Sequence, residues 1–247
     1  MNFFSLFKRN LIYKLKKKVS IDTDQINFEN LDNLFRYYGS DKANFFKLTN
    51  KAGHGFSKFY EKKLEKYKEK KINILEIGSY AGASAAAFAK YLPNSKIFCF
   101  DINISNFKYK SKNIHVFGVD INNKKKIQTI LTSIFSQHNF NEFDLIIDDG
   151  SHNLSDLLIS FKLFFKIVKS GGLFIIEDLK HPNYYEYNKD INHIFMNDFL
   201  NNLSNKKKTL SNIFNEKEQE ELMNTIEKVE NFKGNLDSSD ICFVTKN

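Results

Sequence analysis

The sequence predicts an α/β fold: a doubly wound, mostly parallel seven-stranded sheet with one antiparallel strand and an N-terminal helical extension. Short continuous apolar runs stop abruptly and are followed by helical patterns, which is typical of strands buried on both faces of a parallel sheet. The run at 72–77 leads into a turn of small residues that opens a helix. The last two apolar runs are joined by a Gly- and Asn-containing connection, which favours a hairpin over another crossover.

With 247 residues, the chain suits one α/β domain with an extension. We expect residues 1–70 to form the N-terminal helical extension and a loop that caps the ligand. Residues 71–247 form the main domain. Within it, the polar and aromatic-rich region at about 180–222 is expected to be irregular and to roof the substrate pocket.

The amino-acid composition limits which partners and which cellular location the protein is expected to have. The net charge is +8, but Arg9 and Arg36 are the only arginines, and bidentate reading of guanine or phosphate prefers Arg. Nucleic-acid binding is therefore disfavoured. Cys99 and Cys242 lie in apolar runs and read as core residues, and no apolar run approaches the roughly 20 residues needed to span a bilayer. These features predict a cytoplasmic protein.

The first 20 residues have the pattern of a basic amphipathic helix. Apolar residues recur at a spacing near i, i+4, namely Phe3, Phe4, Phe7, Leu11, Leu15 and Val19. Lys and Arg occupy many of the sequence positions between them. Such a helix could lie on an anionic membrane through residues 1–19, pack against a partner subunit in a homo-oligomer, or dock on its own domain. The sequence leaves these three alternatives open.

Three elements precede the main domain. A helical pattern at 31–38 ends at Gly39, which leaves Ser40, Asp41 and Lys42 in a loop. His54, between two glycines, lies in a second loop. A charged helix is expected from Phe59 to Lys70, and the first strand follows.

Acidic residues follow the next strands and suggest a nucleoside ligand. The helix after the small-residue turn runs to Leu92, where Pro93 breaks it. The strand at 97–100 ends at Asp101, which can hold both hydroxyls of a ribose, and the strand at 114–119 ends at Asp120, beside an adenine. NAD and S-adenosylmethionine fit this pattern equally well.

Two features separate these two ligands. The dinucleotide fingerprint G-x-G-x-x-G is absent, because Tyr80 stands where its middle glycine would allow close approach of a pyrophosphate. The chain then finishes with strands at 225–232 and 240–245, a hairpin-like end that suits a sheet with one antiparallel strand.

Two strands end in carboxylates. The strand at 145–147 is followed by Asp148, Asp149, Gly150, Ser151 and His152, and the strand at 172–176 by Glu177 and Asp178. One strand–helix–strand unit separates them, so the strands should be neighbours and their four acids should converge. Because no Arg is near in sequence, a hard divalent cation is the natural counter-charge. The alternative is that one or two of these acids merely cap helices.

Together these motifs resemble class I S-adenosylmethionine-dependent methyltransferases. More narrowly, they resemble metal-dependent sugar O-methyltransferases that modify antibiotic deoxysugars and bacterial surface heptoses, with relatives in the cephalosporin hydroxylase-like group. The resemblance rests on YGSDK at 38–42, LEIGSYAGAS at 75–84, FDIN at 100–103, IIDDGSH at 146–152 and FIIEDL at 174–179.

The resemblance implies roles for individual residues. Mg²⁺ would be bound by Asp149, Glu177 and Asp178, and His152 would be the general base beside Asp149. S-adenosylmethionine would be held by Ser40, Lys42, Glu76, Gly78, Ser79, Ala81, Ser84, Asp101, Ile102, Asp120, Ile121 and Asp148.

The implied function is O-methylation of a sugar hydroxyl, on a nucleotide-linked sugar such as a heptose in surface (capsule) polysaccharide biosynthesis. One alternative is methylation of another small-molecule hydroxyl, on a phosphorus-linked group or an antibiotic sugar. The other is a non-enzymatic cofactor-binding scaffold, for which the intact DDGSH and ED motifs would be unnecessary.

Overall fold

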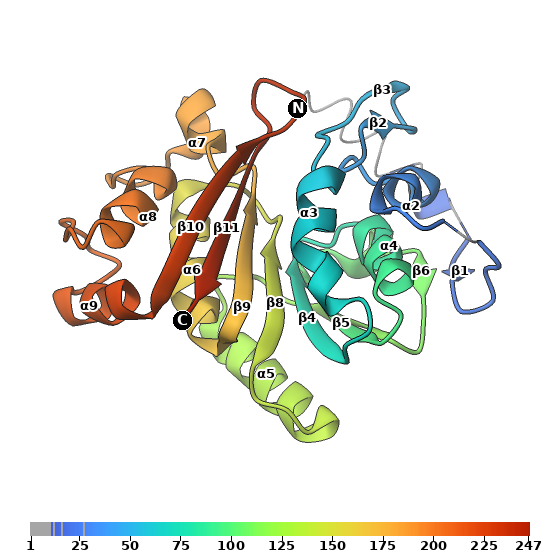
Figure 1. Cartoon of the computed structure of the whole chain (residues 1–247), viewed down its shortest axis with the longest axis horizontal. Helices are drawn as coiled ribbons and strands as arrows, with labels where there is room; N and C mark the ends of the chain where they lie inside the picture. Colours follow the sequence, from blue (N-terminus) through green and yellow to red (C-terminus); the bar gives the residue numbers. More distant parts are fainter. Residues whose placement is uncertain (1–10, 12, 16, 27) are drawn as a thin grey trace.

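A computed structural model of the chain describes residues 11, 13–15, 17–26 and 28–247. Its main sheet has the strand order β10–β11–β9–β8–β4–β5–β7 (Figure 1). The strands are β4 (Ile72–Ile77), β5 (Ser95–Asp101), β7 (Ile114–Gly118), β8 (Phe143–Asp148), β9 (Val168–Glu177), β10 (Ile226–Lys233) and β11 (Asp240–Lys246). The pairs from β7 to β9 are parallel, whereas β11 runs antiparallel to both β9 and β10. The predicted seven-stranded sheet with one antiparallel strand is therefore confirmed.

Helices cover both faces of this sheet. Consecutive strand residues face opposite layers, as Ile74 and Leu75 do, which is why the strands read as continuous apolar runs. One layer holds α2 (Leu31–Tyr38), α3 (Ser57–Leu64) and α4 (Ala83–Tyr91). The other holds α5 (Lys124–His138), α6 (Leu154–Phe164), α8 (Met196–Ser204) and α9 (Glu216–Thr225). Cys99 and Cys242 are free thiols in these cores, as predicted.

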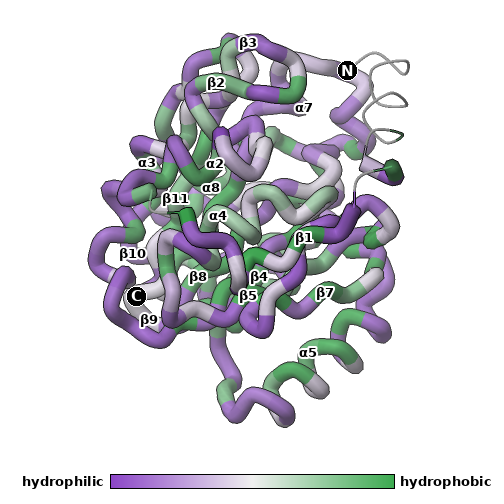
Figure 2. The backbone as a smooth tube through the Cα atoms, turned by 90° about the vertical axis from the view of Figure 1, so that its right-hand side faces the viewer, coloured by the Kyte–Doolittle hydropathy of each residue, from purple (hydrophilic) through white to green (hydrophobic). Residues whose placement is uncertain are grey.

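Several short elements complete the described chain. They are β1 (Val19–Ser20), β2 (Phe45–Phe46), β3 (Lys51–Ala52), β6 (Tyr109–Lys110), α7 (His181–Tyr184) and the 3₁₀ turns η1 (Glu65–Tyr67), η2 (Ile104–Asn106), η3 (Phe165–Ile167) and η4 (Glu186–Asn188). The helix expected from Phe59 to Lys70 is thus shorter, with α3 passing into η1. Figure 2 shows α5 extending from the body of the molecule with mixed hydropathy, consistent with its burying only Ile127 and Ile134.

The extension packs directly on the sheet. Asn30 caps α2 by accepting a hydrogen bond from the Asn33 amide, and Gly39, with φ 85°, ends the helix. The rings of Phe35 and Tyr60 lie 6.2 Å apart, and both contact Phe88 of α4. Residues 31–64 therefore share one hydrophobic core with the main domain.

The described part of the N-terminal segment departs from the predicted apolar stripe. Leu11, Leu15 and Val19 are exposed, whereas Tyr13 is buried and meets the Tyr80 ring edge-on. Residues 1–10, 12 and 16 lie outside the described residues, so the amphipathic-helix hypothesis stays a prediction. No helix among the described residues is long and apolar enough to cross a bilayer.

The expectation that residues 180–222 are irregular is wrong for α8 and α9. In α8, the buried residues Met196, Phe199, Leu200 and Leu203 recur at i, i+3, i+4 and i+7. In α9, Asn215 and Glu218 form a reciprocal capping box. Both signals are legible in the sequence, and tertiary packing of the apolar stripe stabilises these short helices.

A pair of histidines behind β5 makes stability depend on pH. The rings of His115 and His138 lie 4.6 Å apart with Lys96 beside them. Burial lowers the pKa of both imidazoles, and Lys96 lowers it further. Since the unfolded chain then binds more protons, their contribution to stability is fully present above about pH 6.5 and is lost as the pH falls below it.

Replacing both histidines with glutamine should remove this dependence. Between pH 7.5 and 5.5, we expect the wild-type protein to lose more unfolding free energy than the double variant. Urea denaturation at the two pH values measures the difference. Equal losses in both proteins would show that the pair does not titrate differently on folding.

Candidate active site

A cavity of about 990 Å³ opens at the carboxyl ends of the parallel strands. Of the site residues predicted from the sequence, all except Glu76 line it. The strand-end motifs therefore meet at one cavity, as predicted. The strands β8 and β9 are neighbours, as also predicted, with Asp148 opposite Ile176.

The turn after β4 forms one wall of the cavity. Gly78, Tyr80 and Gly82 all have positive φ, which lets the backbone turn sharply before α4. A Cβ at Gly78 would lie 2.0 Å from the Asp149 carbonyl oxygen, and the Asp149 amide donates to the Ile77 carbonyl over 2.9 Å. The turn and the end of β8 are thus held in direct backbone contact.

Glu76 lies behind this turn. It is fully buried, and one carboxylate oxygen accepts a hydrogen bond from the Ser84 hydroxyl. Burial raises its pKa. Glu76 therefore supports the turn from inside the fold, whereas Ser79, Ala81 and Ser84 face the cavity.

The acids predicted to bind the nucleoside form the adjoining wall. Asp101 accepts hydrogen bonds from the amides of Tyr80 and Asn103, both over 2.7 Å, which fixes its carboxylate beside the turn. Asp120 is exposed and accepts from the Asn122 amide over 2.9 Å. Ile102, 75% exposed, and Ile121 lie on the same wall, where an apolar ring could pack on them.

Asp148 lies between this wall and the carboxylate cluster. It is buried, accepts a hydrogen bond from the Gly150 amide over 3.2 Å, and burial raises its pKa to about 6. Its carboxyl group can therefore be either donor or acceptor near neutral pH.

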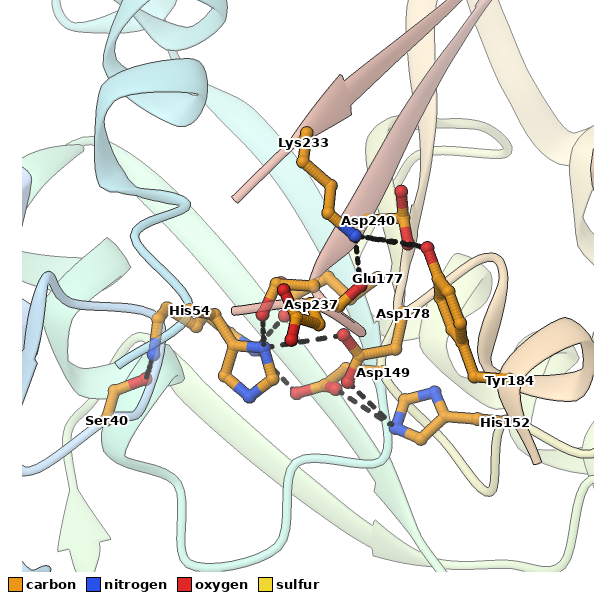
Figure 3. Close-up of polar contacts among 12 residues, drawn as sticks. Ser40, His54, Asp149, His152, Glu177, Asp178, Tyr184, Lys233, Asp237 and Asp240 are labelled. Carbon is orange, nitrogen blue, oxygen red and sulfur yellow. Dashed lines mark hydrogen bonds and ion pairs between the residues drawn. The ribbon is translucent and has the colours of Figure 1, made fainter. Parts of the chain in front are cut away.

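The three candidate metal ligands converge at the ends of β8 and β9. Figure 3 shows Asp149, Glu177 and Asp178 gathered between His54 and His152. Their donors are of the kind that hard divalent cations prefer. Within the described ranges, however, no three acidic, histidine or cysteine side chains are arranged around a common metal position.

Lys42 lies between two of these three carboxylates. Its Nζ lies 2.5 Å from Asp149 Oδ2 and 2.7 Å from Glu177 Oε2, and its side chain is buried. Burial lowers the pKa of Lys42, but the two carboxylates outweigh it and raise the pKa well above the usual range. Lys42 was predicted to contact the cofactor; in the structure its ammonium group lies among the candidate metal ligands.

Sequence reasoning missed two further residues of this cluster. The Tyr60 hydroxyl donates a hydrogen bond to Glu177 Oε1, and burial raises the pKa of Glu177 to about 8 in spite of Lys42. His54 Nδ1 lies 3.4 Å from Asp178 Oδ1 and 2.7 Å from the Ser239 hydroxyl. Burial lowers the pKa of His54, but Asp178 outweighs it and raises the pKa to about 9. No spacing rule connects Tyr60 to an acid 117 residues away.

His152 faces the same carboxylates. Its Nε2 lies 3.7 Å from Asp149 Oδ1 and 3.8 Å from Asp178 Oδ2, while Nδ1 is buried and has no hydrogen-bond partner among the described residues. His152 and Asp178 have φ of 58° and 49°, in the left-handed region. Such strained non-glycine residues cluster at functional sites.

The opposite wall comes from the end of β9 and the last hairpin. His181, Tyr185 and Tyr187 line the cavity, with Leu236 and Ser238 from the β10–β11 turn. Tyr184 donates a hydrogen bond to Asp240 over 2.8 Å, and Lys233 contacts both, so α7 is tied to the hairpin (Figure 3). The start of the predicted lid region, 180–188, thus borders the cavity, whereas α8 and α9 lie beside β10 (Figure 1).

The charge of the cavity opposes that of the whole chain. Among its lining residues, Lys42 is the one Lys or Arg, against eight acids. The acids are Asp41, Asp101, Asp120, Asp148, Asp149, Asp156, Glu177 and Asp178.

A comparison with protein families decides what kind of domain contains this cavity. Residues 75–179, from the end of β4 to the residue after Asp178, match a family model described as a methyltransferase domain. Residues 75–179 are a methyltransferase domain. The resemblance to class I S-adenosylmethionine-dependent methyltransferases that the motifs indicated is confirmed.

Two curated relatives of this chain are O-methyltransferases by name. The chain is 27% identical to mycinamicin VI 2''-O-methyltransferase of Micromonospora griseorubida over 51% of its own length and 32% of the relative. It is 30% identical to demethylmacrocin O-methyltransferase of Streptomyces fradiae, over 53% of its length and 34% of the relative. The chain spans about a third of the length of these relatives.

A solved structure shares the fold of nearly the whole chain. The methyltransferase MycE of the mycinamycin biosynthetic pathway, in complex with Mg and SAH, superposes with a TM-score of 0.68 at 21% identity. The match covers 90% of this chain and 55% of MycE. The methyltransferase domain and the elements around it therefore adopt one known fold.

Proposed function

We propose that this chain is an S-adenosylmethionine- and Mg²⁺-dependent O-methyltransferase that acts on a sugar hydroxyl. The observation that carries the proposal is that one cavity joins the glycine turn and Asp101 to the wall of Asp149, Glu177, Asp178 and His152. The named relatives are sugar-directed O-methyltransferases of macrolide antibiotics, and the solved structure of similar fold holds Mg and SAH.

The residues of the cavity suit this chemistry. When bound, S-adenosylmethionine supplies an electrophilic methyl group, and Mg²⁺ supplies a charge that acidifies a hydroxyl. Asp101 and the turn after β4 would hold the nucleoside and methionine portions. Asp149, Glu177 and Asp178 would hold the cation.

His152 would take the proton from the sugar hydroxyl at Nε2, the nitrogen that faces Asp149 and Asp178. A hydroxyl is barely ionised at neutral pH, so removing its proton while the two reactants are aligned is the task left to the protein.

The acceptor sugar remains a prediction. The resemblance implies a nucleotide-linked sugar, such as a heptose of surface polysaccharide. A neutral glycoside is the second candidate, and the acidic lining of the cavity favours it, because eight acids outnumber Lys42, His54 and one bound Mg²⁺ as neighbours of a diphosphate.

The first test is calorimetric binding of S-adenosylmethionine and of NAD, each with and without Mg²⁺. We expect S-adenosylmethionine to bind with a micromolar Kd and NAD not to bind. Binding of NAD instead would contradict the proposal, and binding of neither would favour a scaffold without this cofactor.

The second test measures methyl transfer from labelled S-adenosylmethionine to two acceptor panels, nucleotide-linked sugars and neutral glycosides. Transfer should stop when EDTA removes divalent cations and return when Mg²⁺ is added in excess. Transfer that persists in EDTA would contradict the role of the metal. The panel that is methylated identifies the acceptor class.

A further inference from the structure

The position of Lys42 between two candidate metal ligands has a consequence for how a metal binds. Its ammonium group contacts Asp149 Oδ2 and Glu177 Oε2, on the two adjacent strand ends. A Mg²⁺ ion would need to approach carboxylate oxygens to about 2.1 Å. The ammonium group and the metal ion therefore compete for the same carboxylate oxygens and for their negative charge.

The other oxygens of these two carboxylates also face protein groups. Glu177 Oε1 accepts from Tyr60, and Asp149 Oδ1 faces His152 at 3.7 Å. Asp149 and Glu177 thus each already have a partner from the protein. The two partners of Glu177 differ in charge, because the Lys42 side chain is a cation and the Tyr60 side chain is neutral.

The backbone that carries Lys42 is fixed. The Lys42 carbonyl accepts hydrogen bonds from the amides of Phe56, over 2.9 Å, and Ser57, over 3.3 Å. The Lys42 amide in turn donates a hydrogen bond to the Ser40 hydroxyl oxygen over 3.3 Å. The side chain alone can therefore withdraw from the carboxylates, about its own rotatable bonds.

We propose that Lys42 is an internal counter-cation that competes with the divalent ion for Asp149 and Glu177. In the metal-free protein it holds together the half-buried carboxylate of Asp149 and the buried carboxylate of Glu177, which would otherwise repel each other. It thereby lowers the affinity for the metal below what the carboxylates alone would give. The inference rests on the proposed function, because it assumes that these carboxylates bind a metal.

The test compares Lys42→Met, which removes the charge and keeps the length of the side chain, with Tyr60→Phe. The second variant removes a neutral hydrogen bond from the same carboxylate and serves as the matched control. Mn²⁺ alone is titrated into each protein, with bound ion measured by electron paramagnetic resonance and by calorimetry at one pH and low salt.

Lys42→Met should bind Mn²⁺ about tenfold or more tighter than the wild-type protein, because a like charge next to the ion is removed. Tyr60→Phe should stay within about threefold of the wild-type protein, since no charge changes. Without metal, Lys42→Met should melt at a lower temperature, and Mn²⁺ should raise its melting temperature by more than it raises that of the wild-type protein.

Unchanged or weaker Mn²⁺ binding by Lys42→Met would overturn the proposal, since a purely structural lysine would act in that direction. Lys42→Gln, which can still donate a hydrogen bond, repeats the test in case the methionine variant is unfolded without metal. Folding of either variant on addition of Mn²⁺ would support the competition, and variants that stay unfolded with Mn²⁺ would refute it.

Binding of S-adenosylmethionine to the same samples separates this inference from the proposed function. Cofactor binding without any Mn²⁺ binding would overturn the role of Lys42 and leave a methyltransferase. Tighter Mn²⁺ binding by Lys42→Met without cofactor binding would support the role of Lys42 and contradict the methyltransferase.

Discussion

Replacing His152 with alanine is expected to lower the turnover of methyl transfer by about two to four powers of ten, the usual contribution of a general base. Binding of S-adenosylmethionine should be unchanged, because His152 faces the carboxylates Asp149 and Asp178 and not the turn after β4. Single-turnover kinetics with labelled cofactor and calorimetry measure the two quantities.

Two controls separate proton transfer from local strain. Since His152 has a φ of 58°, alanine adds backbone strain there, whereas asparagine tolerates this region. His152→Asn should therefore lose as much turnover as His152→Ala. His181→Ala removes the neighbouring imidazole, whose ring lies 5.5 Å away, and should lose less than about tenfold. Near-normal turnover in either His152 variant would exclude the general-base role.

Replacing Gly78 with alanine should destabilise the fold by about 3 kcal/mol or more and abolish cofactor binding. The added Cβ would lie 2.0 Å from the backbone oxygen of Asp149, so neither a rotamer change nor a side-chain shift can relieve the clash. The strands β4 and β8 would have to separate where the cavity begins. Denaturant unfolding and calorimetry with S-adenosylmethionine measure the two effects.

Gly171 provides the matched control for Gly78. It also has a positive φ, 71°, but nothing lies within 4 Å of an added Cβ. Gly171→Ala should therefore cost only the conformational strain, about 1–2 kcal/mol, and leave cofactor binding intact. Equal destabilisation of the two variants would show that the contact with Asp149 is not what requires glycine at position 78.

The sheet and much of the candidate site could be predicted from local sequence patterns. Strands buried on both faces give continuous apolar runs, and their carboxyl ends meet at one edge, so Asp101, Asp148 and Glu177 could be placed without a structure. The end of each run marks a strand end, and that is where the predicted acids lie.

Residues whose roles depend on long-range packing could not be predicted. Lys42 and Tyr60 reach Glu177 across 135 and 117 residues, because α3 and the loop after α2 pack over the end of β9. The burial of Tyr13 instead of Leu11 and Leu15 likewise depends on its contact with Tyr80. In α8 and α9 the signals were present in the sequence but were outweighed by the polar character of the region.

The order of strands has a consequence for synthesis of the protein on the ribosome. β11 pairs with both β9 and β10 and separates them, although it follows both in the chain. Until β11 emerges, the apolar edge of β9 is unpaired and β10 has no partner in the sheet. The nascent chain therefore carries an open strand edge, a template for aggregation, from the synthesis of β9 until β11 emerges. Insertion of β11 closes that edge and brings Ser239 to His54, so the candidate active site and the protected sheet are completed in the same step.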